Sequence, residues 1–222
     1  MKPYLNAAMA LFLLSAAPLA AQAAEPKIRV VRVIGDDIRV PIPDGFCEPE
    51  GPFQDNARLA EASDTQNVTF LALFSCADMA KGDVQHMIYI KGPKELLTTR
   101  ASLKELLDAM GAVPESEMNK VLADDSISPG VEKDASKAFG QKVEMKTEIQ
   151  PAAKDAYAYY LAGSVEADVG ERHIVTAVGV AMTSVKGHVL SYNAYMPGKD
   201  VAAICAALEQ AKAETRKLLA AN

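Results

Sequence analysis

Side chains that could ligate a metal gather in the segment from Cys76 to Met87, which also contains His86, Met79 and two aspartates. Thiolate, thioether and imidazole groups are ligands that copper(I) or zinc accepts. The spacing follows none of the usual ligand patterns of structural zinc sites. The segment therefore predicts either a metal site that uses Cys76, His86 and Met87, or a structural corner in which these side chains are bonded, buried or capping a turn.

The three cysteines are Cys47, Cys76 and Cys205. Cys47 and Cys76 each stand at the edge of an expected strand, so the two could meet in a disulfide, but spacing alone does not fix connectivity. We leave both the bonded and the free states of this pair open. Cys205 falls on the apolar face of the expected last helix, where we predict a buried free thiol that acts as a small hydrophobe.

Patterns of known catalytic sites do not occur in the sequence. It contains neither a G-x-S-x-G nor an H-E-x-x-H motif, and neither a glycine-rich phosphate loop nor a C-x-x-C pair. We therefore expect no cofactor. The only histidines are His86, His173 and His188. His173 and His188 could lie across from each other near one sheet edge, but we expect two separate histidines exposed at strand ends. A hydrolase would need one of the three beside a serine or an acid.

Several tyrosines follow one another in the last third of the chain. Tyr157, Tyr159 and Tyr195 could form a binding surface, because a tyrosine offers contact area together with a polar tip. The alternative interpretation is that most of these rings pack in the core beneath a helix.

The first 23 residues are typical of a cleavable export signal. Lys2 is followed by an apolar run over residues 7–17, then Pro18, then Ala21-Gln22-Ala23. The run is too short for a membrane-spanning helix. We expect cleavage after Ala23 or one residue later, and delivery to the periplasm, or secretion if the host has no outer membrane.

The bulk composition excludes some classes of partner. The formal net charge is −6, so no basic excess exists for a general nucleic-acid or anionic-membrane binder. Hydrophobic residues make up 50% of the chain, which favours a folded domain over disorder. No stretch after the signal is long and apolar enough to span a bilayer.

The first half of the chain predicts a hairpin, two strands and a helical middle. A capping box at Ser102 and Glu105 begins a helix that we expect Gly111 to end. The apolar run at 68–75 is interpreted as a central strand buried on both faces. The expected elements are strands at 27–34, 38–42, 68–75 and 85–91, helices at 55–63, 102–111 and 114–122, and a long loop at 124–140 that could contain a helical turn around Ala135.

The second half is more regular. We expect strands at 143–149, 157–169, 174–185 and 189–196, the last three joined by links so short that neighbours must be antiparallel. Asp200 then caps a closing helix, whose apolar face is expected to be Val201, Ile204, Cys205, Leu208, Ala211 and Leu218. The sequence thus predicts an α+β fold with a mostly antiparallel sheet covered by helices, an N-terminal hairpin and a C-terminal closing helix.

This order of elements resembles the PsbP-like (Mog-type) α/β/α sandwich. The likeness is carried by residues 157–219, with Tyr192-Asn193-Ala194-Tyr195, Pro197 and an Asp-capped helix, and by Ile42-Pro43-Asp44-Gly45-Phe46. The resemblance implies a binding or assembly module, whose partners differ widely among members. It transfers no site residue, because no family motif of site residues is present.

We therefore expect residues 24–222 to form one α+β domain that serves as a non-catalytic, exported binding or assembly module. Its partner would be a protein or a small ligand in the periplasm. Two alternatives stay open: a periplasmic metal-binding protein that uses the Cys76–Met87 segment, and an unrecognised hydrolase.

Overall fold

The computed structural model describes residues 27–122 and 128–222, so the predicted signal peptide (1–23) lies outside the described residues. Within these two ranges, no helix has the length and apolar character that a membrane crossing requires. The elements follow in the order β1 (Ile28–Val33), β2 (Asp36–Pro41), β3 (Phe46–Cys47), α1 (Pro52–Ser63), β4 (Asn67–Ser75), α2 (Cys76–Ala80), β5 (Met87–Pro93), η1 (Lys94–Leu96), α3 (Leu103–Ala112), α4 (Glu115–Leu122), α5 (Ser128–Phe139), β6 (Val143–Lys154), β7 (Tyr159–Val169), β8 (Arg172–Val185), β9 (His188–Pro197) and α6 (Val201–Ala220).

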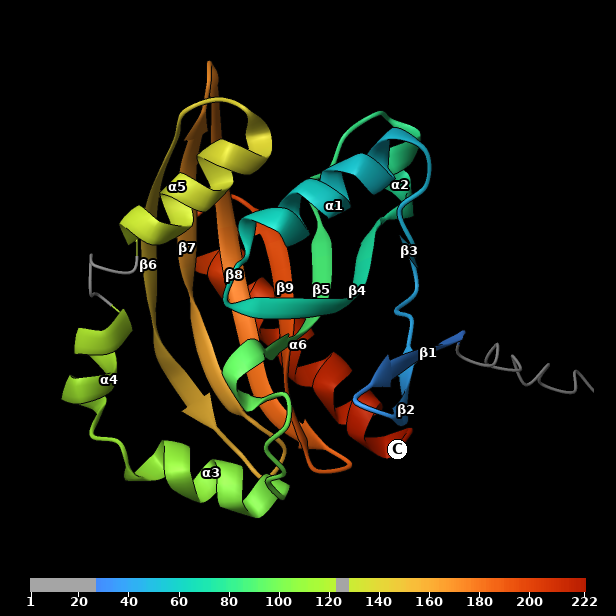
Figure 1. The fold of residues 1–222 in the computed structure, drawn as a ribbon, viewed down its shortest axis with the longest axis vertical. Helices are drawn as coiled ribbons and strands as arrows, with labels where there is room; N and C mark the ends of the chain where they lie inside the picture. The colour runs from blue at the N-terminus through green and yellow to red at the C-terminus, as the bar shows by residue number, and fades with distance from the viewer. Residues whose placement is uncertain (1–26, 123–127) are drawn as a thin grey trace, which may run out of the picture.

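Seven strands form one antiparallel sheet in the order β3-β4-β5-β9-β8-β7-β6, and β1 with β2 forms a separate two-stranded sheet (Figure 1). The predicted α+β class with a mostly antiparallel sheet is confirmed. The meander of β7, β8 and β9 is also as predicted. Its second turn uses Lys186 and Gly187, whose φ values of 51° and 83° suit the two-residue turns that match strand twist.

Helix α6 packs across one face of the sheet against β7, β8 and β9. Asp200 caps it, because its Oδ1 accepts a hydrogen bond of 2.9 Å from the N–H of Ala203. The helix lies so close to β8 that a Cβ added at Gly179 would stand 2.4 Å from the backbone of Ala207. The predicted apolar face was partly wrong: Val201 and Cys205 are exposed. The buried stripe is Ala207, Ala211, Glu214, Thr215 and Leu218.

The main core lies between this sheet face, α6 and the β1–β2 hairpin. Strand register places one row of side chains across five strands, namely Leu71, Ile90, Tyr192, Ala181 and Tyr160. All five are buried, and alternate residues of the hairpin close the same cluster. Tyr160 and Tyr192 thus belong to the core, whereas Tyr157 is exposed and Tyr159 and Tyr195 are half-buried, so the core interpretation holds for two of these five tyrosines.

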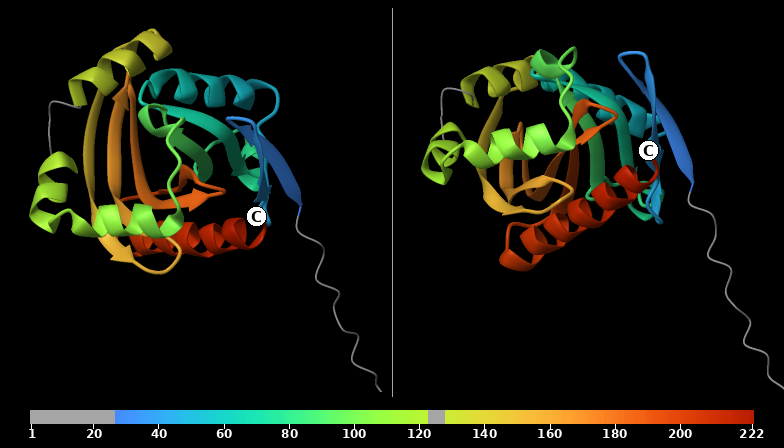
Figure 2. Two further views of the ribbon diagram at one scale, coloured as in Figure 1. Left: turned by 60° about the horizontal axis from the view of Figure 1, so that its bottom comes forward. Right: turned by 90° about the horizontal axis from the view of Figure 1, so that it is seen from below.

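The other helices cover the opposite face, which gives the α/β/α layering (Figure 2). Helix α1 packs on α5, α5 and α4 contact β6, and α3 contacts β8. Three sequence predictions are corrected here. Residues 128–139 form helix α5 instead of part of a loop, since Pro129 stands in the first turn, where a helix tolerates proline. Helix α3 continues through Gly111 to Ala112, and helix α1 begins at Pro52, before the predicted start at residue 55.

Strand β4 is not the central strand that its apolar run predicted. Its outer neighbour β3 has only two residues and pairs only at Phe46↔Ser75 and Cys47↔Phe74. Over the described parts of the chain, the rest of the outer edge of β4 has no strand partner. The missing partner is explained by the hairpin, because β1 and β2 pair with each other and pack on the core as a separate sheet.

The two edges of this hairpin differ. On the β2 side, the Asn222 side chain accepts a hydrogen bond from the N–H of Arg39 at 3.0 Å and donates one to its C=O at 2.8 Å. Lys186 Nζ donates to the C=O of Asp37 on the same edge, at 2.8 Å. On the β1 side, no strand partner occurs among the described residues. The open edge of β1 contacts β4, whose outer edge is open too.

Candidate functional site

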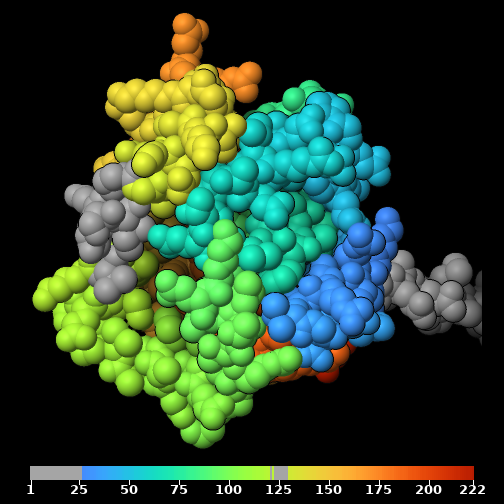
Figure 3. Space-filling view, viewed as in Figure 1, coloured from blue at the N-terminus to red at the C-terminus, as the bar shows by residue number. Residues whose placement is uncertain are grey.

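A cavity of about 460 Å³ lies between β1 and β4, and we call it the β1–β4 slot. Four consecutive residues of each strand line it, 29–32 of β1 and 69–72 of β4, and α1 closes one side. Because neighbouring side chains of a strand point to opposite faces, a wall made of four consecutive residues exposes the strand's edge. Figure 3 shows the hairpin, in blue, bordering the cyan and teal segments of α1 and β4.

The hydrogen-bond pattern shows which backbone groups face the slot. Ile42 N–H donates to Lys27 C=O at 2.7 Å, so this pair is a bonded pair of the hairpin. Bonded and non-bonded pairs alternate in an antiparallel ladder, which turns the N–H and C=O groups of Val30 and Arg32 away from β2. They therefore point toward the slot.

The same reasoning applies to the opposite wall. Ser75 N–H donates to His86 C=O on the β5 side, and Cys76 N–H donates to Gly45 C=O on the β3 side. Alternation then turns the backbone groups of Ala72 outward, toward the slot. The slot is bounded by two strand edges whose free donors and acceptors face each other, above a floor to which the buried Val31 and Leu71 belong.

Charged side chains surround the opening of the slot. Arg29 Nε lies 3.5 Å from Glu48 Oε1, and Arg58 Nη1 lies 3.5 Å from Asp55 Oδ1. Arg32 is exposed and donates only a long hydrogen bond of 3.5 Å to the C=O of Gly35. No carboxylate in the described part of the chain pairs with Arg32, so this guanidinium is available to an acidic group.

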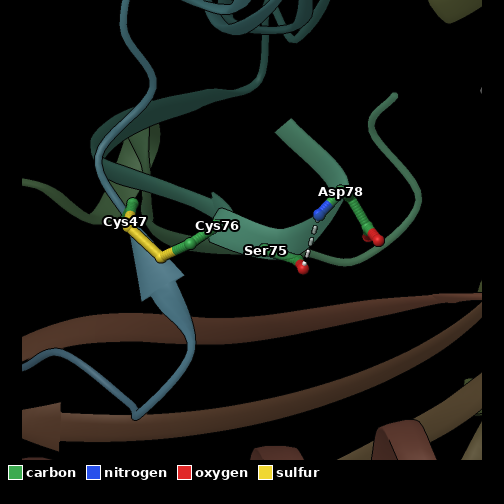
Figure 4. The surroundings of a disulfide bond; sticks show 4 residues. All are labelled: Cys47, Ser75, Cys76 and Asp78. Carbon is green, nitrogen blue, oxygen red and sulfur yellow. Dashed lines mark hydrogen bonds between the residues drawn. A yellow bond between two sulfur atoms is a disulfide. The ribbon is translucent and has the colours of Figure 1, made fainter. Parts of the chain in front are cut away.

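Cys47 and Cys76 form a disulfide with a Cα–Cα distance of 5.3 Å (Figure 4). It fastens β3 to the start of α2, where Ser75 Oγ accepts a hydrogen bond of 3.2 Å from Asp78 N–H. Beside it lies a second cavity of about 550 Å³, which we call the disulfide pocket. Its lining comprises Lys27, Ile42, Phe46, Cys47, Glu48, Glu50, Phe53, Cys76 and Met79.

The predicted metal ligands have other contacts. Cys76 is bonded to Cys47 and therefore has no thiolate to offer a metal. His86 Nδ1 lies 2.8 Å from Asp78 Oδ2, which also accepts from the His86 backbone N–H at 3.1 Å. Burial alone would raise the pKa of Asp78, but these hydrogen bonds outweigh it and lower the pKa. Met87 Sδ lies 3.7 Å from the hydroxyl of Tyr89. No group of three or more His, Cys, Asp or Glu side chains suited to a metal occurs within the described ranges.

The three tyrosines proposed as a binding surface do not lie together. Tyr157 is exposed in the turn before β7, with the Arg216 guanidinium 5.3 Å from its ring centre. Tyr195 is half-buried on the sheet face away from α6 and packs edge-to-face on Tyr89, with ring centres 5.7 Å apart. Tyr159 shares that face, but its row of the sheet runs through Met182 and Ser191, four residues from Tyr195.

The histidines are dispersed, and each contacts an aspartate. His173 Nδ1 lies 2.8 Å from Asp168 Oδ1 at one end of β8, and His188 follows the other end, so the alternative in which the two face each other near one sheet edge is wrong. His188 is buried, not exposed, and its Nε2 lies 2.9 Å from Asp36 Oδ2. This oxygen also accepts from Arg100, and the two hydrogen bonds lower the pKa of Asp36, that from Arg100 the most. The arrangement connects the hairpin turn to the β8–β9 turn.

Sequence reasoning did not identify the slot. The available signal is Pro41, because a proline within a strand indicates a sheet edge or a strand end. In the ladder it occupies a non-bonded position, where no N–H is needed. That signal concerns β2, however, whereas the slot depends on the position of β1 relative to β4. Contacts between residues far apart in the sequence determine this position.

The chain matches no protein-family model and no curated protein sequence. Among solved structures, it is similar to the solution structure of cyanobacterial PsbP (CyanoP) from Synechocystis sp. PCC 6803. The identity is 8%, the TM-score is 0.38, and the alignment covers 92% of this chain and 98% of that chain. This is the family that the sequence resembles. The likeness concerns the fold alone, and no residue role is taken from it.

Proposed function

We propose that this protein is a non-catalytic, exported binding module that takes an extended segment of a partner protein as an added strand in the β1–β4 slot. The observation that supports this proposal is the pair of facing strand edges, with Val30 and Arg32 on one side and Ala72 on the other. Strand addition to an open edge is a general mode of peptide recognition, in which main-chain hydrogen bonds supply affinity.

The size of the slot suits such a guest. Each wall contributes four residues, and a strand rises about 3.3 Å per residue, so a segment of about four residues fits along it. Because β1 and β4 are in contact, whereas a strand bonded on both edges would need its neighbours about 9.6 Å apart, the guest pairs with the β1 edge and the β4 wall lies beside it. The floor formed by Val31 and Leu71 offers apolar contact to alternate side chains.

We place this activity in the periplasm. The first 23 residues have the charge, apolar core and A-x-A order of an export signal. The Cys47–Cys76 disulfide agrees with this location, because such bonds persist in oxidising compartments.

The test uses the chain from residue 24 onward and a capped hexapeptide of alternating valine and threonine. We expect the peptide to shift the amide NMR signals of Val30, Arg32 and Ala72. A version N-methylated at every second residue, which loses those donors, should bind far more weakly. If neither peptide moves these signals at millimolar concentration, or if both bind equally, strand addition in the slot is wrong.

A pair of proline variants tests the β1 wall. Val30→Pro removes an N–H that faces the slot, while Asp37→Pro removes one on the opposite edge of the same hairpin. Proline is tolerated at such outward positions of edge strands, so both variants should fold, which circular dichroism checks. We expect Val30→Pro to weaken binding and Asp37→Pro to leave it unchanged. Equal affinities for the two variants would contradict the proposed binding edge.

A further inference from the structure

We infer that the disulfide pocket receives one large apolar side chain of the segment bound in the slot, and so sets which partners bind. This inference rests on the proposed function. The lining of the disulfide pocket is mainly apolar, with Ile42, Phe46, Phe53 and Met79 around the two sulfur atoms of the disulfide. Aromatic rings and sulfur atoms make favourable contacts with aromatic and thioether groups, so phenylalanine, leucine or methionine suits this pocket.

The disulfide pocket and the slot adjoin one another. Glu48 lines both cavities, and its ion pair with Arg29 stands at the junction between them. Lys27, the residue just before β1, lines the pocket, and Arg29 of β1 lines the slot. Residues two apart on a strand are about 6.6 Å apart, so an extended guest that continues beyond the slot along β1 brings its next side chain to the pocket.

The charges around the two cavities give the guest a direction. Glu48 and Glu50 line the disulfide pocket against the single amine of Lys27, which disfavours a carboxylate there. Arg32 and Arg58 line the slot, and Arg32 has no carboxylate partner in the described part of the chain. The segment that fits therefore has a large apolar side chain at its pocket end and an acidic side chain near Arg32.

The experiment compares two capped octapeptides that differ at one position. Both contain alternating valine and threonine with one aspartate, and one has phenylalanine where the other has alanine at the pocket end. Burying a phenylalanine is worth roughly a 10- to 100-fold gain in affinity. We therefore expect the phenylalanine peptide to bind the native protein roughly 10- to 100-fold more tightly than the alanine peptide.

The same two peptides are then tested on a protein variant that combines Phe53→Ala with Met79→Ala. It should bind both peptides with nearly the alanine peptide's affinity, because the wall that recognises the ring is gone. Phe139→Ala removes a phenyl group that is exposed elsewhere, on α5, and should keep the native preference. Because the peptide substitution is read on the native protein, the result does not depend on whether the double variant folds.

The two proposals fail in different ways. If both octapeptides bind the native protein equally and still shift the Val30, Arg32 and Ala72 signals, the pocket assignment is wrong and strand addition stands. If neither peptide shifts those signals, strand addition fails, and the pocket assignment fails with it. A preference for phenylalanine that persists in the double variant would also overturn the pocket assignment.

Discussion

Asp64, just after the end of α1, binds Lys91 of β5: the Lys91 Nζ lies 2.7 Å from Asp64 Oδ2, and the two side chains are only 15% and 19% exposed. Asp64 also accepts hydrogen bonds from the backbone and side chain of Asn67. Burial alone would raise the pKa of Asp64, but the charge of Lys91 and these hydrogen bonds outweigh it and lower the pKa. The pair fixes the end of α1 on the sheet face that α6 does not cover.

This pair predicts a loss of stability in acid. Because the pKa of Asp64 is lower in the folded state, its contribution is fully present above its unfolded pKa and disappears as the pH falls through the folded pKa. Lys91→Met should cost on the order of 3 kcal/mol at neutral pH and less in acid. Urea unfolding at several pH values measures this. The control is Lys104→Met, whose partner Asp108 is exposed and whose loss should leave the unfolding free energy nearly unchanged at every pH.

The contact between α6 and β8 predicts that Gly179→Ala is destabilising. The new methyl group would stand 2.4 Å from the Ala207 backbone, so the helix must shift away from the sheet. Overpacking of this kind costs about 1 to 3 kcal/mol, measurable by thermal melting. Gly130→Ala on α5 is the matched change, because no atom outside its own neighbourhood lies within 4 Å of the added carbon. Equal melting temperatures for the two variants would argue against this close packing.

The disulfide is expected to stabilise the fold by closing a loop with a sequence separation of 29 residues, which contains α1 and β4. In the chain-entropy account, a loop of this length contributes about 3 to 4 kcal/mol. Cys47→Ser combined with Cys76→Ser should therefore lower the unfolding free energy by about that amount in denaturant titrations. Cys205→Ser, at an exposed free cysteine, should leave it unchanged.

The charges at the slot predict a modest electrostatic contribution to binding. Arg32→Ala should weaken an aspartate-containing peptide by no more than about fivefold, because exposed ion pairs contribute at most about 1 kcal/mol. The effect should shrink as salt is added. Arg39→Ala removes an exposed arginine from the other strand of the hairpin and should have no effect. Fluorescence anisotropy with a labelled peptide at two salt concentrations measures the affinity of each variant and its salt dependence.

Most of the sheet could be predicted from local sequence. The alternation of residues 157–196 and the short links at Gly170 and Lys186 fix both the strands and their antiparallel pairing. Helix α5 was missed because Pro129 and Gly130 resemble helix breakers, although the first turn of a helix tolerates both. Cys205 was misplaced because the stripe that faces the sheet is set by the close approach at Gly179, which no local pattern reveals.

The candidate site could not be predicted from local sequence, for a related reason. The apolar residues of β4 correctly indicated burial, since Leu71 and Leu73 face the core and Phe74 is buried on the other side. Burial of both faces, however, does not require a strand on each side. Side-chain patterns report on the faces of a strand and not on its hydrogen-bonded edges, so the open edge of β4 left no trace in them.

The Asn222 amide has a consequence for how the protein avoids self-association. If both edges of the hairpin were open, copies of the protein could pair edge to edge into open-ended fibrils, a known hazard of exposed strands. The Asn222 side chain bonds both backbone groups of Arg39 and so blocks strand pairing at this edge of β2. Lys186 blocks the same edge at the C=O of Asp37. Among the described residues of the hairpin, the β1 edge that faces the slot has no such block, so a guest strand can join there.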